Sequence, residues 1–533
     1  MSSVIEHGSP SRRRTMTLLA PRLRSTLHRL PRNRGHRWGD PAVVGIVALL
    51  VYGLHGYDGI LNRDLGVFTY GGEQVARGVP PYVGIFNSVG PLADAVPGLA
   101  IWLGHFVDAD PILSARLLFT VLSALCCALL CVLARDALGS RAAGFIAPAV
   151  FLTFEDFLHL ASDGPREKTT MLVFLLACQI LLGRRRWALA GACAALATLT
   201  WQPVFAVTLG AMAAAVLLDQ QDRRARILLR FTMGGLVPSA ATVCYFLGAG
   251  ALSRAIDGFI VINVDYTEQP SALTRPHAIW TMEWASYHWS LPLAIAGLVL
   301  LVVLGAEALP RARPPTASPE ARRLVACAAG GVVGTAWTLL VVNGGPDLFV
   351  LLPFAALGLA ATGVIVLGHL SRRTALAGTV AVVSLGVLVA GLDSVTTRDD
   401  KLILQRADVD AVLGTQPRDV TVVSLNAPQV LALAGRESPV PYQIMSSSQQ
   451  RYLDGTYPGG IHGFLGTLTV LHPTFVAVSR SFKDPWPDSW LATDYWRIGG
   501  GAGWTWYINR AAGHSAWRQA RNAHNEVIAT YGG

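Results

Sequence analysis

Long apolar runs constrain this chain more than any other feature. Stretches of about 20 residues with few charges recur over the first three quarters of the sequence. The chain is 52% hydrophobic and only 14% charged, with a mean hydropathy of +0.43, which is unlike a soluble domain. We therefore predict an α-helical polytopic membrane protein. Candidate runs lie at residues 41–57, 91–107, 112–134, 141–155, 168–183, 187–202, 203–218, 227–249, 289–307, 324–342, 348–368 and 374–392.

The distribution of arginine indicates which of these runs cross the membrane. With the N-terminus cytoplasmic and 91–107 not crossing, the cytoplasmic loops contain fifteen Arg, against four Arg or Lys in the opposite loops. Basic residues accumulate in cytoplasmic loops, and a crossing by 91–107 exchanges the two sets. This run also opens with Pro91 and contains Asp94 and Pro97, which suits a helix at the membrane surface. The prediction is about eleven spans, with residues 58–111, 156–167, 250–288, 343–347 and everything after 392 on the outer face.

The two ends of the chain differ from its apolar middle. Residues 1–40 hold nine Arg against Glu6 and Asp40, which favours a basic tail at an anionic cytoplasmic leaflet over nucleic-acid binding. All seven Cys lie in apolar segments, so no disulfide framework or Cys-based zinc site is predicted.

The sequence after residue 392 predicts a small α/β domain. Its expected helices are 401–413 and 428–434, and its expected strands are 419–426, 474–479 and 503–508. The predicted parts are a cytoplasmic tail (1–40), a transmembrane catalytic domain (41–392) and an extracytoplasmic α/β domain (393–533).

The first outer loop stands out from the Ala-, Leu- and Val-rich background. It reads NRDLGVFTYGGEQVARGVPPYVGIFNSVGPL, and loops with such special residues tend to carry function. Asp64 follows the first span by a few residues, so its carboxylate is expected at the membrane surface, near the depth of a lipid phosphate. The alternative is a surface ion pair between Asp64 and Arg63.

The order of these parts resembles the GT-C superfamily of polyprenyl-phosphate-sugar-dependent glycosyltransferases. That group includes the protein O-mannosyltransferases and the enzyme that adds aminoarabinose to lipid A. The likeness runs from DLGVFTYGGEQVARGVPPY and the GPL before the interfacial helix to the RDALGSR and RRRW turns and the C-terminal LNAPQVLALAGRESPVPY. It implies a GT-C-like fold and gives Asp64 the role of general base. Many relatives have two adjacent acids there, whereas Arg63 and Leu65 flank Asp64.

A donor with a phosphate leaving group needs cations nearby. The stretch ASDGPREKTTM places Arg166 and Lys168 where an outer loop enters a span, and Lys168 is the only Lys among the spans. Arg offers phosphate a bidentate fork and Lys a point charge. The alternative is snorkelling at the interface. Arg275 and His277 of the long outer loop are further candidates.

Acceptor or auxiliary roles are assigned to Asp163, Asp265, Glu268 and Tyr70. The aromatic and acidic residues of the loop 250–288 suit a polar ring-shaped acceptor, although an interfacial aromatic belt has the same composition. The group Glu155, Asp156, His159 and Asp163 has spacing compatible with a divalent metal, but interfacial carboxylates more often bind water or Arg. No metal or other cofactor is therefore predicted.

The sequence predicts a multi-pass glycosyltransferase of the cytoplasmic membrane. It transfers a hexosyl or pentosyl group, with inversion, from a polyprenyl-phosphate donor to a glycan, lipid or protein acceptor of the cell envelope, on the outer face. A transporter or lipid flippase is the alternative, but transport sites lie near the bilayer midplane, whereas here polar residues gather on one face. A non-catalytic scaffold also remains open.

Overall fold

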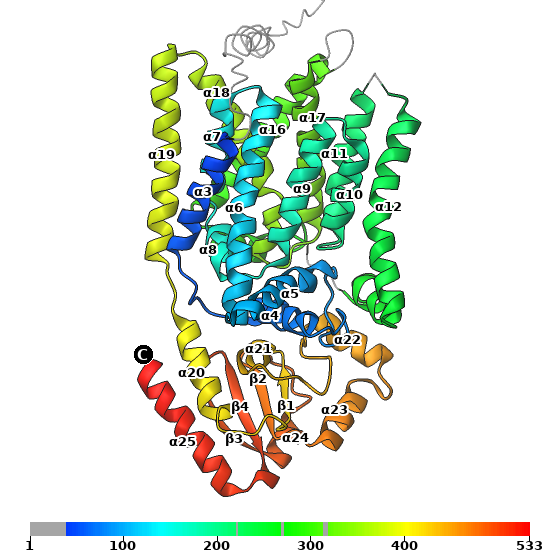
Figure 1. Cartoon of the computed structure of the whole chain (residues 1–533), viewed down its shortest axis with the longest axis vertical. Helices are drawn as coiled ribbons and strands as arrows, with labels where there is room; N and C mark the ends of the chain where they lie inside the picture. The colour runs from blue at the N-terminus through cyan, green and yellow to red at the C-terminus, as the bar shows by residue number, and fades with distance from the viewer. Residues whose placement is uncertain (1–38, 220–221, 268–270, 313–317, 533) are drawn as a thin grey trace, which may run out of the picture.

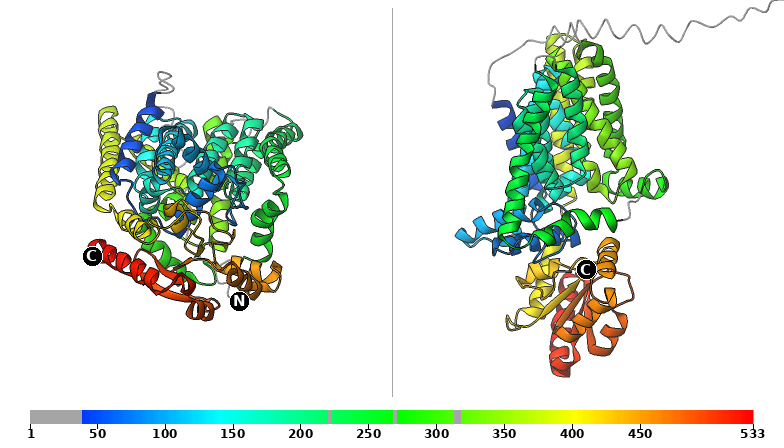
Figure 2. Two further views of the ribbon diagram at one scale, coloured as in Figure 1. Left: turned by 60° about the horizontal axis from the view of Figure 1, so that its bottom comes forward. Right: turned by 90° about the vertical axis from the view of Figure 1, so that its right-hand side faces the viewer.

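The computed structural model describes residues 39–219, 222–267, 271–312 and 318–532. Nearly all of the basic tail, and Glu268, lie outside the described residues. A bundle of long helices forms one end of the molecule and a smaller α/β domain forms the other (Figure 1). Two short helices lie crosswise between them, as the side view in Figure 2 also shows.

Every predicted span coincides with a helix of the bundle. These helices are α3 (Gly39–Leu54), α6 (Pro111–Leu138), α7 (Arg141–Phe151), α9 (Glu167–Gly183), α10 (Trp187–Thr198), α11 (Val204–Leu218), α12 (Arg224–Gly248), α16 (Ser290–Ala312), α17 (Pro319–Leu340), α18 (Leu352–Leu367) and α19 (Arg372–Thr396). Among the described residues, α6, α12, α16, α17 and the helix beginning at Arg372 are long and apolar enough to cross a membrane by length and composition. The bent pair of α7 and α8 (Glu155–Asp163) adds a sixth candidate. The helical membrane fold is confirmed, and the count of eleven crossings stays a prediction.

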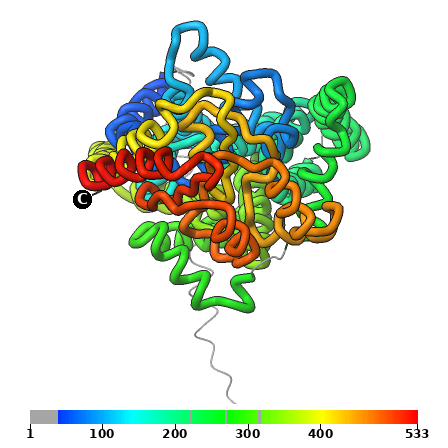
Figure 3. The backbone as a smooth tube through the Cα atoms, turned by 90° about the horizontal axis from the view of Figure 1, so that it is seen from below, coloured from blue at the N-terminus to red at the C-terminus, as the bar shows by residue number. Residues whose placement is uncertain are grey.

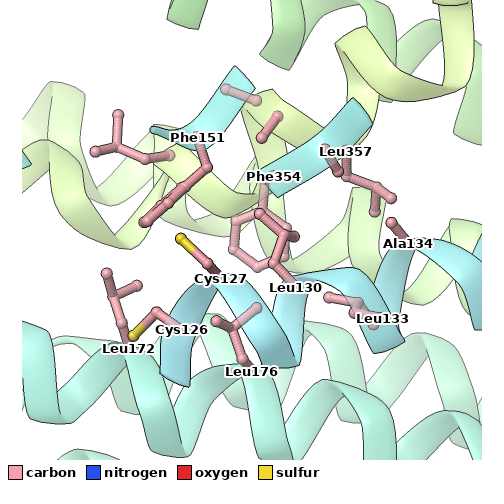
Figure 4. Packing of buried hydrophobic residues seen from close by; sticks show 14 of the residues in the cluster. Cys126, Cys127, Leu130, Leu133, Ala134, Phe151, Leu172, Leu176, Phe354 and Leu357 are labelled. Atoms are coloured by element: carbon pink, nitrogen blue, oxygen red, sulfur yellow. The ribbon is translucent and has the colours of Figure 1, made fainter. Parts of the chain in front are cut away.

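Helix α6 lies at the centre of the bundle. Figure 4 shows its Cys126 and Cys127 between α9, which contributes Leu172, and the side formed by α7 and α18, which contribute Phe151 and Phe354. All of these side chains are buried. The seven cysteines are free thiols.

The run at 91–107 forms α5 (Leu92–Gly104) and a following 3-10 turn. Together with α4 (Arg63–Ala76) it lies across the end of the bundle (Figure 1). Asn62 caps α4 by accepting a 3.0 Å hydrogen bond from the backbone N–H of Leu65. The segments expected on the outer face form α13 (Leu252–Ile256), α14 (Ile262–Asp265), α15 (Pro276–Tyr287) and the 3-10 helix η3 (Gly345–Val350), and α13 and α14 share a buried cluster with the first outer loop and the C-terminal domain.

The C-terminal part contains a four-stranded sheet of order β1-β2-β4-β3. Strand β1 pairs in parallel with β2, and the remaining neighbours pair antiparallel. The strands are β1 (Val422–Leu425), β2 (Phe475–Ser479), β3 (Tyr495–Gly500) and β4 (Trp504–Asn509), and the helices are α20 (Lys401–Leu413), α21 (Gln429–Ala434), α22 (Ser447–Thr456), α23 (Gly460–Leu471), α24 (Asp488–Asp494) and α25 (His514–Tyr531). The predicted elements are confirmed, whereas β3 and the last four helices were not foreseen.

The first outer loop and the C-terminal domain share one apolar core. Leu65 and Phe68 of α4 belong to the same buried cluster as Val430 of α21 and Trp506 of β4. The α/β domain therefore covers this end of the bundle, as the view from below shows (Figure 3).

Specific contacts fix the spacing of this shared core. A Cβ at Gly66 would lie 2.6 Å from the Cβ of Gln429, so glycine permits the close approach of α4 and α21. The side chain of Gln405 accepts from the N–H of Leu61 at 2.8 Å and donates to its carbonyl at 3.1 Å. These contacts hold the C-terminal domain against the start of α4.

The topology can be tested by thiol labelling. In a Cys244→Ala background, Val470→Cys should react with a membrane-impermeant maleimide from outside intact cells, because it lies on the C-terminal domain and is exposed. His369→Cys, exposed at the other end of the bundle after α18, should react only after permeabilisation. The reverse pattern would place the active face inside.

Buried Glu73 predicts a dependence of stability on pH. Burial raises the pKa of Glu73 from 4.5 to about 8, because the Arg77 guanidinium, 3.5 Å away, offsets the loss of solvent only in part. Between these two values the folded chain retains a proton that the unfolded chain has released, so stability falls as the pH rises through this window.

Glu73→Gln has no proton to lose and should be stabilised relative to wild type at pH 8 but much less at pH 5. The apparent melting temperature in detergent measures this difference at each pH. Glu437→Gln is the matched control, since this exposed carboxylate lies 3.5 Å from the same Arg77. Parallel pH profiles for wild type and Glu73→Gln would contradict the assignment.

Candidate active site

A cavity of about 700 Å³ lies where the bundle meets the C-terminal domain. One part of its wall is polar and contains Arg63, Asp64, Arg166, Lys168 and Asp347. Another part is apolar and includes Phe205 of α11, Trp337 of α17 and Val341. The N-terminal end of α22 lines the cavity with Ser446, Ser447, Ser448 and Gln449. A polar pocket with an apolar wall suits an amphiphilic ligand.

Asp64 is held by two guanidinium groups from different elements. Its Oδ1 accepts hydrogen bonds from Nε and Nη2 of Arg63, at 2.9 and 2.7 Å. Its Oδ2 accepts a 3.0 Å hydrogen bond from Nη1 of Arg166. Because Arg63 begins α4 and Arg166 immediately precedes α9, the carboxylate joins the crosswise helix to the bundle.

These cations control the protonation of Asp64. Partial burial alone would raise the pKa of this carboxyl, but Arg166 and Arg63 outweigh that effect and lower the pKa well below its usual range. The side chain remains 39% exposed, so a ligand in the cavity can reach it. Asp64 is therefore ionised at neutral pH and is a weak base for as long as both guanidinium groups hold it.

Lys168 lies deeper in the same cavity and is paired with carboxylates. Its Nζ is 3.0 Å from Oε1 of Glu167 and 2.8 Å from Oδ1 of Asp347, and it lies 5.2 Å from the centre of the Trp201 ring. The side chain is only 6% exposed. Asp347 is fixed in turn, because its Oδ2 accepts a 2.6 Å hydrogen bond from the backbone N–H of Asn343.

Charges of both signs alternate along this wall. Arg166 Nε is 3.3 Å from Oε2 of Glu167, so each of the cations Arg63, Arg166 and Lys168 has an acidic neighbour. An incoming phosphate must compete with carboxylates that already hold these cations. A phosphate therefore binds only where an Arg or Lys side chain gives up a hydrogen bond to its carboxylate partner and donates that hydrogen bond to the phosphate instead.

Several polar residues of the cavity were not foreseen from the sequence. Gln202 donates 3.1 Å hydrogen bonds to the carbonyls of Ser88 and Phe259, and Asn263 donates to the Ser88 carbonyl at 2.7 Å. These bonds tie the first outer loop to the loop that follows α12. Gln202 carried a readable signal, since it is a polar residue between two apolar runs.

The remaining predicted site residues lie outside this cavity. Asp163 is 3.6 Å from His55 Nε2, and Tyr70 is buried, with its hydroxyl accepting a 3.0 Å hydrogen bond from the backbone N–H of Ser438. Asp265, Arg275 and His277 are exposed and do not contribute to the cavity wall. Arg275 and His277 are thus not brought to Asp64, whereas Arg166 and Lys168 are.

No group of three or more His, Cys, Asp or Glu side chains is arranged for a metal ion within the described part of the chain. Two of the residues considered for a metal, His159 and Glu155, instead form ion pairs with residues outside that group. His159 Nε2 is 2.9 Å from Asp393 Oδ2, and His288 Nδ1 is 2.6 Å from Glu155 Oε2.

The structure is similar to crystal structures of ArnT from Cupriavidus metallidurans. The apo structure is 13% identical over 88% of this chain and 98% of that chain, with a TM-score of 0.60. The structure bound to undecaprenyl phosphate is 14% identical over 89% of this chain and 98% of that chain, also with a TM-score of 0.60. No protein-family model and no curated protein matches the chain by sequence. The fold shared with ArnT confirms the GT-C-like architecture that the sequence resemblance implied.

Proposed function

We propose that the protein is an inverting membrane glycosyltransferase that uses a polyprenyl-phosphate-linked sugar. The observation that carries this proposal is the position of the Asp64 carboxylate in a cavity with cations on one side and an apolar wall on another. The similar fold of ArnT, one structure of which is bound to undecaprenyl phosphate, supports a lipid-phosphate donor. The sequence motif that implied a general base leads to the same residue.

The two kinds of wall match the two ends of such a donor. Arg166 and Lys168 offer charge-assisted hydrogen bonds to the phosphate. Phe205, Trp337 and Val341 lie at the ends of bundle helices and offer an apolar path toward the lipid. The sugar then lies between the phosphate and the C-terminal domain.

The chemistry requires few groups from the protein. Asp64 accepts the proton of the acceptor hydroxyl, and the hydroxyl oxygen forms a bond with the anomeric carbon. The bond between that carbon and the phosphate oxygen breaks, and the lipid phosphate leaves with the electron pair. Arg166 and Lys168 stabilise the charge that develops on the phosphate, and the attack from the opposite side inverts the anomeric centre.

The two guanidinium groups on Asp64 couple donor binding to base strength. A phosphate that takes hydrogen bonds from Arg166 removes part of the charge that lowers the pKa of Asp64. Asp64 then becomes a stronger proton acceptor with donor bound than without it.

The cavity position favours transfer over transport. A transporter requires a path to the other end of the bundle, with its site near the midplane. Here Asp64, Arg166 and Lys168 line one cavity together with Ser446 and Gln449 of the C-terminal domain, which adjoins the end of the bundle that carries α4 and α5 (Figure 1).

Asp64→Asn keeps the shape of the side chain but removes the proton acceptor. Transfer from a lipid-phosphate sugar by the purified chain should fall by about two to four orders of magnitude, while polyprenyl-phosphate binding persists. Asp108→Asn is the control, because Asp108 is an exposed carboxylate of the same outer segment with backbone geometry that Asn tolerates. Near wild-type transfer by Asp64→Asn would place the base elsewhere.

Lys168 and Asp347 should have opposite effects on the donor. Lys168→Ala removes a phosphate contact made in both the ground state and the transition state, so we expect the donor KM to rise by about 10- to 100-fold. Asp347→Asn releases the same ammonium from one of its two acidic partners, with Glu167 still 3.0 Å away, and should lower the donor KM.

The double variant Lys168→Ala/Asp347→Asn separates binding from folding. It removes the carboxylate that Lys168→Ala leaves without its cation, so it should recover thermal stability without recovering donor affinity. Recovery of affinity in the double variant would show that Lys168 serves the structure and does not bind phosphate.

A further inference from the structure

A second groove, of about 480 Å³, lies on another side of Asp64. Arg63 and Asp64 line both this groove and the cavity of about 700 Å³ described above, which we call the donor cavity. Arg166 and Lys168 line the donor cavity alone. The carboxylate therefore stands between two separate spaces. Its Oδ2 accepts a hydrogen bond from Arg166, which lines the donor cavity. Its Oδ1 accepts a hydrogen bond from Arg63, which lines both spaces.

The C-terminal domain supplies much of the second groove. Arg480 and Ser481 follow β2, Ser479 ends it, and Gln429 begins α21. The groove lacks the aromatic wall that makes the donor cavity fit for a lipid chain.

Two of these side chains carry polar groups that no other described residue pairs with. Gln429 is only 3% exposed, and its Oε1 has no hydrogen-bond partner among the described residues. The exposed Arg480 guanidinium forms no ion pair in the part of the chain that the structure covers. The hydroxyls of Ser479 and Ser481 lie 2.9 Å apart and complete a row of small polar groups.

We propose that this groove binds the acceptor, and that the acceptor is a glycan bearing an anionic group such as a carboxylate or phosphate. The proposal rests on the function proposed above. Arg480 binds the anionic group through its planar fork, and Gln429 with the two serines binds sugar hydroxyls. A glycan fits better than a lipid headgroup, because Ile60 and the fully buried Leu61 are the large apolar side chains among the described lining residues and are too few to form a wall for acyl chains.

The position of the groove also fits the chemistry of inversion. The attacking hydroxyl must approach the anomeric carbon from the side opposite the leaving phosphate. A donor phosphate at Arg166 and an acceptor near Arg480 place the two reactants in different spaces that meet at Asp64. The groove thus presents a hydroxyl to the base without crossing the donor's path.

Binding of soluble glycans to the purified full-length chain tests the proposal without requiring turnover. The probes are a uronic-acid oligosaccharide and a neutral oligosaccharide of equal length, measured by saturation-transfer NMR and thermophoresis. Wild type should bind the acidic probe more tightly than the neutral one. Arg480→Gln should weaken the affinity for the acidic probe by about tenfold or more and leave the affinity for the neutral probe unchanged. Arg518→Gln, which removes an exposed Arg from α25 of the same domain, should have no effect.

Gln429→Ala should weaken the binding of both probes. Neither Arg480→Gln nor Gln429→Ala should alter polyprenyl-phosphate binding. Equal affinity of wild type and Arg480→Gln for the acidic probe would overturn the proposal. Displacement of that probe by phosphatidylglycerol nanodiscs would overturn it too, in favour of a lipid headgroup.

The outcomes distinguish this groove from the proposed function. Arg480-dependent glycan binding in a chain that transfers no sugar would sustain the groove and refute the transferase. Transfer to an acidic glycan with an acceptor KM unchanged in Arg480→Gln would sustain the transferase and refute the groove.

Discussion

The organisation of the site depends on one carboxylate shared by two guanidinium groups. Asp64 and Arg63 belong to the crosswise helix α4 and Arg166 to the entry of α9, so the hydrogen bond from Arg166 to Asp64 requires these two elements to converge. The convergence leaves space on both sides of the carboxylate. The same contacts that fix Asp64 in place also lower its pKa, so in the mechanism proposed above the binding of an anion at Arg166 and the activation of the base are one event.

The bundle was readable from the sequence because lipid imposes strong rules on length and composition. Periodicity likewise gave α20 its bounds, since Lys401–Leu413 is a regular helix with its own start and stop. Strand β3 escaped prediction for a physical reason. Its sequence YWRIGG ends in glycines and contains an irregularity between Arg497 and Gly499, so it exists through pairing with β4 and not through local preference.

The candidate site was readable only in part. Asp64 and Arg166 could be grouped because both flank spans on the same predicted face. The pairing of Lys168 with Asp347 could not be predicted from the sequence. Asp347 lies almost 180 residues further along the chain and reaches the cavity because η3 packs against α9. Conversely, Arg275 has the right residue type in the right loop, but it lies exposed at the start of α15. Composition identifies a face of the protein, whereas tertiary packing selects the residues that meet there.

The core shared by α4 and the C-terminal domain limits how this protein can be rearranged. The first outer loop and the last quarter of the chain are distant in sequence, yet neither buries its apolar surface without the other. A chimaera that exchanged only the C-terminal domain for that of a relative would bring a foreign surface against Gly66, where no side chain fits. Recombination should therefore preserve the two segments as a matched pair, and substitutions in one should covary with substitutions in the other.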